Sequence, residues 1–267
     1  EKPETEKYTS YDLALDNKDA LAGDVYKNAE NYYKSVFEKT GGSINFYPDK
    51  SGALPTAEIY HRETSEFSVH DVKDFCKKHG ITENVFFISA FGITLGKYNF
   101  KKDAVFTTIY HGRNDSRLEN TVGMLVKTLP VYCKFDKDTT IQAYMTAVSE
   151  QLLSSMANDI FPFSDICAKY GFNSDLTFAY QAELSDDYPI GNTIAKGEDL
   201  SLDMAKMPLL IQVREYNHTY VLTAEYRSDM YSQAFIDGIL DSYEAAMSSA
   251  LKTKYVSEIS VISQSGV

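Results

Sequence analysis

Histidine is the side chain best suited to acid-base chemistry near neutral pH, and this chain contains five. Two of them stand four residues before an aspartate, as His70/Asp74 and His111/Asp115. An imidazole can act as a general base if it lies within about 3.2 Å of the group that it deprotonates. Residues four apart also share one face of a helix, where an exposed His/Asp pair is ordinary. His111, which precedes a Gly-Arg turn, is the histidine to consider as a base, and a surface or structural role is the more frequent alternative.

The residue patterns of other site chemistries are missing from the sequence. It contains no G-x-S-x-G nucleophile elbow and no phosphate loop, and its Cys and His spacings match no zinc site. We therefore expect neither a metal nor a nucleotide cofactor. Cys76, Cys133 and Cys167 are odd in number and widely spaced, and the first residues lack the features of a signal peptide. These features predict reduced thiols and a cytoplasmic location.

The stretch 111–131, HGRNDSRLENTVGMLVKTLPV, has the most informative order of residues. Arg113 follows a β-branched strand at a turn, where its guanidinium would either bind a carboxylate or stay solvated. Gly123 would allow a close approach of the backbone, and the residues after it would form one wall of a cleft. An ordinary strand with an edge proline is the alternative. The candidate cleft residues are His111, Gly112, Arg113, Gly123, Val126, Lys127, Thr128, Leu129 and Pro130.

Helices and strands alternate around this stretch. Apolar residues recur at helical spacing over 22–39 and 139–157. Ser68 caps a helix that ends at His79-Gly80, and Thr82 caps one that is apolar nearly all round, which is typical of a helix buried on several sides. We expect strands at 57–67, 104–110 and 175–181, a loop over 183–201, a hairpin over 209–229 that turns near Asn217-His218, and a last helix over 232–251.

Strands that alternate with helices and end in a late hairpin predict an α/β fold. We expect a two-layer sandwich, with helices packed on a mixed β-sheet and no linker that divides the chain. At 267 residues, of which 43% are hydrophobic, the chain can bury a substantial core. No apolar run is long enough for a membrane span, and a net charge of -12 without a basic stripe argues against a nucleic-acid partner.

Six short motifs follow one another along the chain and together resemble a known family. They are Tyr8-Thr9-Ser10-Tyr11, Ala29-Glu30-Asn31-Tyr32-Tyr33, a helix motif of Thr82, Asn84, Ala90, Leu95 and Tyr98, then Asp103-Ala104-Val105, Gly112-Arg113, and Val122-Gly123-Met124-Leu125-Val126-Lys127-Thr128-Leu129-Pro130. Their order resembles the C-terminal lobe of a condensation domain from a nonribosomal peptide synthetase. In that family the motif that corresponds to 122–130 reads V-G-x-F-V-N-T-L-P. The resemblance covers most of the chain and implies a chloramphenicol-acetyltransferase-like fold, the fold of CoA-dependent acyltransferases.

Several positions depart from the family pattern. Lys127 replaces an asparagine, Tyr132 stands near the usual arginine, and 158–164, NDIFPFS, keeps Pro162-Phe163 of H-Q-D-x-P-F-E but is interpreted as having lost its acids. The family motif H-H-x-x-x-D-G is absent, because it belongs to an N-terminal lobe that this chain does not contain. We expect a single C-terminal lobe over 1–267, in which 1–21 would connect to the missing lobe and 22–262 form the globular part.

The resemblance also implies a function for the parent domain. An acceptor amine attacks a donor thioester, with both substrates held on phosphopantetheine arms of peptidyl carrier proteins, and an amide forms. The catalytic histidine would lie in the N-terminal lobe, so we expect no catalytic residue here and no activity of this chain alone. Arg113 would bridge to the aspartate of H-H-x-x-x-D-G. The expected partners are that lobe, carrier proteins that dock near Lys101-Lys102, and an adjacent adenylation domain.

Two other classes of function stay open. The weakened motifs at Lys127, Tyr132 and Ser164 are also expected of a non-catalytic module that docks carriers or neighbouring synthetase domains. A two-lobed relative with different chemistry, such as epimerisation, cyclisation or ester formation, is the third possibility that the sequence leaves open.

Overall fold

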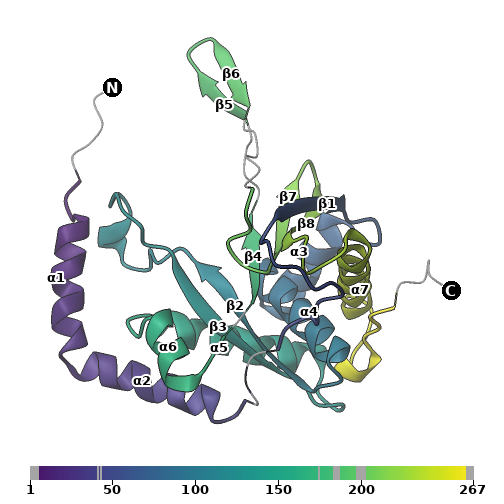
Figure 1. Cartoon of the computed structure of the whole chain (residues 1–267), viewed down its shortest axis with the longest axis horizontal. Helices are drawn as coiled ribbons and strands as arrows, with labels where there is room; N and C mark the ends of the chain where they lie inside the picture. The colour runs from purple at the N-terminus through teal and green to yellow at the C-terminus, as the bar shows by residue number, and fades with distance from the viewer. Residues whose placement is uncertain are drawn as a thin grey trace.

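A mixed β-sheet organises the chain in the computed structural model, which describes residues 6–40, 42, 44–173, 175–182, 187–196 and 203–262 (Figure 1). Within these ranges six strands form one sheet in the order β1-β8-β7-β4-β2-β3. β4 is parallel to both of its neighbours, and the remaining pairs are antiparallel. The strands are β1 (Ala57–Glu63), β2 (Asp103–Tyr110), β3 (Lys127–Lys134), β4 (Leu176–Gln181), β7 (Leu209–Tyr216) and β8 (Thr219–Arg227).

Helices cover both faces of the sheet at β2. Ala104 and Phe106 belong to the larger core cluster with helices α4, α5 and α7, whereas Val105 belongs to a smaller cluster with α2 and α6. Because successive side chains of a strand point to opposite faces, the two clusters lie on opposite sides of β2. The helices are α1 (Ser10–Leu21), α2 (Asp24–Phe37), α3 (Val69–His79), α4 (Glu83–Tyr98), α5 (Ile141–Ala157), α6 (Phe163–Tyr170) and α7 (Gln233–Ala250), with short 3₁₀ turns at η1 (Ser116–Leu118) and η2 (Val256–Glu258).

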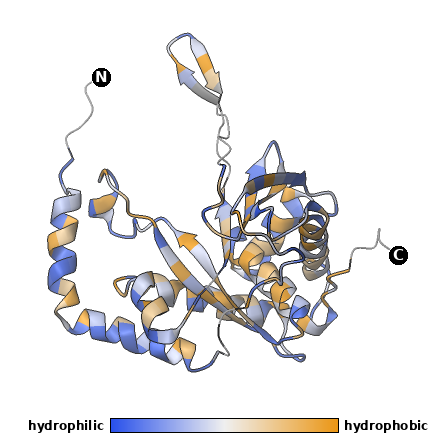
Figure 2. Cartoon of the chain, viewed as in Figure 1, coloured by the Kyte–Doolittle hydropathy of each residue, from blue (hydrophilic) through white to orange (hydrophobic). Residues whose placement is uncertain are grey.

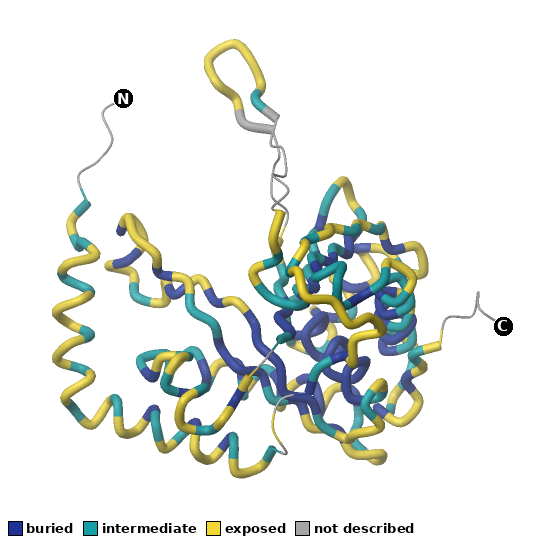
Figure 3. The backbone as a smooth tube through the Cα atoms, viewed as in Figure 1, coloured by how far each residue is buried: buried dark blue, intermediate teal, exposed yellow. Residues whose placement is uncertain are grey.

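Helix α4 is the centre of the larger core. The Thr82 hydroxyl accepts the N–H of Val85 and caps the helix, and all twelve residues from Val85 to Gly96 are buried. Helix α1 differs from α4 in that none of its residues is buried, and the hydropathy and burial of the two helices differ accordingly (Figures 2 and 3). No described helix combines the length and the apolar character that a membrane crossing requires.

The expected α/β class with a mixed sheet is confirmed, as are the helices begun by Ser68 and Thr82. The hairpin turns at Asn217 and His218, which have φ of 47° and 63° and thus match the geometry of a two-residue turn. The helix expected from 139 begins at Ile141, because Thr140 is the residue that caps it.

One expectation about a loop was wrong, and one helix was not predicted. The expected loop over 183–201 contains a hairpin of β5 (Asp187–Ile190) and β6 (Thr193–Lys196), while 183–186 and 197–201 lie outside the described residues. The connecting segment 1–21 contains α1, begun by a capping box in which Thr9 and Asp12 bond each other's backbone N–H. Sequence periodicity missed α1 because a helix without a buried face has no apolar stripe to detect. The Thr-x-x-Asp pattern was the available signal.

Gly92 sets how closely α4 packs on the sheet. A Cβ at this position would lie 2.6 Å from the Cys133 Sγ and 2.8 Å from the Cys133 Cβ. We predict that Gly92→Ala destabilises the fold by about 1–3 kcal/mol, because the core has no room for a methyl group. Gly238→Ala in α7 is the control, since a Cβ there meets nothing within 4 Å and should stabilise by roughly 0.5–1 kcal/mol. Urea unfolding followed by circular dichroism measures both, and equal effects would contradict the packing assigned to Gly92.

The buried thiols predict a loss of stability at alkaline pH. Burial raises the pKa of Cys76 and of Cys133 to about 12, from an ordinary value of 9.0. The native state therefore holds these protons more tightly than the unfolded chain does. The protonated thiols contribute fully to the free energy of unfolding below pH 9, and this contribution is lost as the pH rises toward 12. The loss is on the order of 2 kcal/mol per thiol at pH 11. Urea midpoints at pH 8, 10 and 11 should fall steadily, and a constant midpoint would show that the thiols titrate normally in the fold.

Candidate functional site

Gly112 forms the turn that follows β2. Its φ is 69°, a left-handed conformation that favours glycine, and a Cβ there would overlap the carbonyl oxygen of Leu125. The two ends of the loop 111–126 therefore meet backbone to backbone at this residue. The close approach that we expected at Gly123 is absent, because a Cβ on Gly123 would meet only the Cβ of Ser10, at 3.4 Å.

Arg113 braces the same loop. Its Nη1 donates to the carbonyl oxygen of Leu118 and, at 3.5 Å, to that of Glu119. Among the described residues the guanidinium thus contacts backbone carbonyls and no carboxylate, whereas the sequence suggested either a carboxylate partner or a solvated side chain. It closes the turn around η1 and fixes the path of the chain toward β3.

Neither His/Asp pair has the geometry of a general base. His111 Nδ1 accepts the backbone N–H of Arg113 at 2.9 Å, so a neutral imidazole in this arrangement carries its proton on Nε2. Neither ring nitrogen then has a free lone pair to take a proton from a substrate. His70 lies on α3 with its Nε2 3.2 Å from Asp74, and both side chains are mostly exposed, as expected of a helical surface pair.

Lys127 pairs with an aspartate that the sequence interpretation overlooked. Its Nζ lies 3.0 Å from Asp159 Oδ1 and donates to the Asp159 carbonyl at 3.2 Å. The Asp159 side chain is only 16% exposed. The stretch 158–164 has therefore kept a carboxylate, and it compensates the lysine that replaces the family's asparagine. A lysine in place of the family's asparagine and an aspartate in the stretch 158–164 are both visible in the sequence. Their opposite charges were the available signal for the pair.

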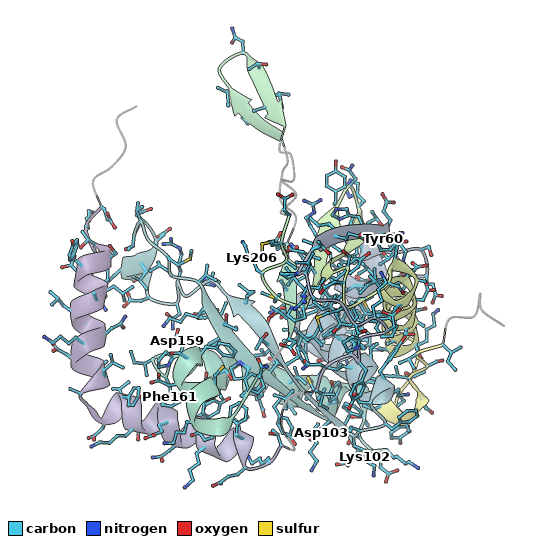
Figure 4. All side chains as sticks on the ribbon, viewed as in Figure 1. Tyr60, Lys102, Asp103, Asp159, Phe161 and Lys206 are labelled. Atoms are coloured by element: carbon cyan, nitrogen blue, oxygen red, sulfur yellow. The ribbon has the colours of Figure 1, made fainter. Side chains whose placement is uncertain are left out.

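A cavity of about 440 Å³ opens beside this ion pair. Leu21 at the end of α1, the start of β3 and the segment before α6 line it, and Figure 4 shows Asp159 and Phe161 beside the β2–β3 pair. Of the nine predicted cleft residues, Val126, Lys127, Thr128 and Leu129 lie in its wall.

Pro130 belongs to strand β3 and is not among the described residues that line the cavity. β3 is the edge of the sheet, where a missing N–H is tolerated, and the Pro130 carbonyl accepts from Gln151 Nε2 at 3.3 Å. For Pro130 the structure therefore agrees with the alternative interpretation, an edge proline, and not with a place in the cleft wall. His111, Gly112, Arg113 and Gly123 shape the neighbouring loop and are not among the described residues that line the cavity.

A polar cluster that sequence reasoning missed holds α1 against the loop. Arg117 pairs with Asp16 at 3.1 Å and with Asp115 at 2.7 Å, and its guanidinium lies 4.5 Å from the centre of the Tyr8 ring. The Tyr8 hydroxyl donates to Asp16, and this bond raises the pKa of Tyr8. Thr121 adds a bond from its hydroxyl to the Tyr8 carbonyl. These contacts place the end of α1 over the cavity although α1 has no buried residue.

The cavity is suited to holding a molecule rather than to attacking one. Neither histidine nor cysteine is among its described lining residues. An ammonium has three N–H donors, and two of those on Lys127 are bound to Asp159. The third can donate to a carbonyl, while the nearby carboxylate leaves the pair neutral overall. The arrangement fits an uncharged chain that carries carbonyl groups, in contact with Leu21, Phe161 and Phe163.

The two glycines of the loop give a test of its construction. We predict that Gly112→Ala destabilises the fold by at least about 2 kcal/mol, because it combines a left-handed φ with a backbone overlap. Gly123→Ala should change the free energy of unfolding by less than about 0.5 kcal/mol, since its Cβ has room. Chemical unfolding of both variants measures this, and an equal loss would mean that Gly112 does not set the loop.

Comparisons with known proteins agree with this architecture. The chain is 23% identical over 262 residues to gramicidin S synthase 2 of Brevibacillus brevis, covering 91% of this chain and 6% of that protein. The first condensation domain of the calcium-dependent antibiotic synthetase superposes with a TM-score of 0.76 at 13% identity, covering 96% of this chain and 58% of that one. The X-domain in complex with OxyB from teicoplanin biosynthesis superposes with a TM-score of 0.80 at 12% identity, covering 98% and 62%.

The chain thus spans a small part of the synthetase that it matches and about six tenths of these two solved chains. The model of the Condensation domain family matches residues 1–265. This chain therefore belongs to the condensation domain family of nonribosomal peptide synthetases.

Proposed function

We propose that this chain is the C-terminal lobe of a two-lobed condensation domain that joins a carrier-bound acyl donor to a carrier-bound aminoacyl acceptor. The observation that carries the proposal is the cavity built from two family motifs, the start of β3 and the segment 159–164. The span of about six tenths of solved condensation-domain chains supports a missing second lobe, which would supply H-H-x-x-x-D-G.

The reaction would be an aminolysis of a thioester. The acceptor amine forms a C–N bond to the donor carbonyl carbon as the C–S bond breaks, and the proton of the amine passes to the departing thiolate. Peptidyl carrier proteins would deliver both substrates on phosphopantetheine, and an adjacent adenylation domain would load them. Holding amine and thioester in one channel can contribute about 7–11 kcal/mol in good cases. Positioning is the contribution to which this lobe's residues are suited.

Two side chains have distinct roles in this proposal. Lys127 donates its remaining N–H to a carbonyl of the bound chain, and Asp159 fixes its position. Arg113 braces the loop through Nη1, and its guanidinium has further N–H donors that can bind the aspartate of H-H-x-x-x-D-G in the other lobe.

A second candidate function is a non-catalytic docking module. The similarity to an X-domain in complex with OxyB favours it, because that fold neighbour is described in a complex with another protein. The hydrogen-bonded state of His111 is equally consistent with this alternative. The two candidates differ in whether the complete domain makes an amide.

The test compares this chain with the longer gene product that contains it. With donor-loaded and acceptor-loaded carriers, we expect no dipeptidyl product from the chain alone and product from the longer protein, measured by mass spectrometry. In the longer protein Lys127→Met should lower the rate at least tenfold, about 1.4 kcal/mol, through loss of positioning. His111→Ala should leave the rate within about twofold.

Two results would contradict the proposal. Turnover by the chain alone that disappears in His111→Ala would place the base in this lobe. A longer protein that binds loaded carriers without forming product would make the chain part of a docking module.

A further inference from the structure

Among the described residues, β3 is an edge strand of the sheet, and the outer side of an edge strand offers its backbone groups to any chain that can pair with them. The N–H of Phe135, just after β3, donates to the carbonyl of Lys102, just before β2, at 2.9 Å. Backbone groups alternate in direction along an antiparallel pair. The odd-numbered residues of β3 therefore bond inward to β2, and the even-numbered ones direct their N–H and C=O groups outward.

Pro130 and Gln151 occupy the middle of this outer edge. Pro130 has no N–H to offer. Its carbonyl accepts from Gln151 Nε2 at 3.3 Å, and the N–H of Tyr132 donates to Gln151 Oε1 at 3.3 Å. A residue of a parallel neighbouring strand makes the same two bonds, to the carbonyl before the facing residue and to the N–H after it. The side-chain amide of Gln151 thus takes the place of one residue of a parallel strand beside Val131.

Gln151 reaches the edge from α5 and is held there by two hydroxyl groups. Its Nε2 donates to Ser155 Oγ at 2.9 Å and lies 3.3 Å from the Tyr32 hydroxyl oxygen. The Tyr32 hydroxyl in turn donates to the backbone carbonyl of Gln151 at 3.1 Å. Ser155 is fully buried, with 0% of its surface exposed. Because these partners on α2 and α5 already restrict the amide, it loses less conformational freedom when it pairs with β3.

The outer edge continues beyond this cap for a short distance. The next outward groups are the Tyr132 carbonyl and the Lys134 N–H, and both residues line a hollow of about 300 Å³ between α2 and α5. Lys134 is exposed and ends the strand with a charge, which discourages pairing with another strand. The capped and uncapped outward N–H groups of Tyr132 and Lys134 therefore lie two residues apart on one strand.

We infer that Gln151 acts as a surrogate strand that closes the β3 edge and prevents a second copy of this chain from pairing with it. The missing N–H of Pro130 and the two bonds of the amide remove three consecutive pairing positions. A second copy is the partner against which an edge must be closed, since every molecule carries the same edge and homo-oligomers form through such self-complementary contacts. Without the amide, the N–H of Tyr132 would be free beside an existing hollow.

Hydrogen exchange of single backbone amides, followed by NMR on the whole chain, tests the cap. In the unaltered chain the Tyr132 N–H should exchange at least tenfold more slowly than the Lys134 N–H. Gln151→Leu removes the amide at similar side-chain size and should speed the exchange of Tyr132 at least tenfold. The N–H of Val131, which bonds inward to β2, should keep its rate and thereby shows that the variant is folded.

Sedimentation velocity at increasing protein concentration tests the closure. Gln151→Leu should form dimers or larger species at concentrations where the unaltered chain does not. Gln142→Leu is the matched control, because it places an exposed leucine on the same helix and position 142 makes no bond to β3 among the described residues. It should sediment like the unaltered chain.

Three results would overturn the inference. They are exchange of Tyr132 as fast as that of Lys134 in the unaltered chain, unchanged exchange of Tyr132 in Gln151→Leu, and equal association of the two leucine variants. The first comparison needs no variant, so it decides the matter even if Gln151→Leu does not fold.

Discussion

The enclosure of helix α4 is the constraint on which the rest of the structure depends. A helix that is apolar all round is stable only where other elements surround it. The sheet, α5 and α7 do so, and twelve consecutive residues of α4 are buried as a result. Gly92 fixes the approach of α4 to β3 through contact at Cys133. The position of the β2–β3 pair follows from this packing. The positions of the loop 111–126 and of the turn between α4 and β2 follow from that of the pair.

The cavity is a consequence of where β3 starts. Gly112 lets the loop after β2 close against Leu125, and Arg113 holds the loop through the Leu118 carbonyl. β3 then begins at Lys127, at the sheet edge, where no other strand of the described residues covers it. The space beyond is bounded by α1 and by the segment before α6. Its chemistry is that of a neutral ion pair in contact with apolar side chains, which suits a site that orients uncharged chains.

The cavity and the turn that carries Phe100 lie at opposite ends of one strand pair. Tyr110, at the end of β2, pairs with Lys127, and Asp103, at its start, pairs with Lys134. An eight-residue strand at about 3.4 Å per residue separates them by roughly 25 Å. The turn between α4 and β2 is therefore remote from the cavity, although the same strand pair leads to both.

The sequence by itself determined the elements with a strong local signal. The caps at Ser68 and Thr82, the apolar surface of α4, the Asn217-His218 turn and the mixed α/β class all follow from residue type and spacing, and the ordered motifs indicated the family. Tertiary structure decided what depends on contacts between distant residues. Lys127 and Asp159 lie 32 positions apart, Arg117 and Asp16 lie 101 apart, and no local periodicity links either pair. The glycine that a close approach requires is Gly112 rather than Gly123, because which backbones meet depends on how the loop closes, and that is set by packing and not by the glycine itself.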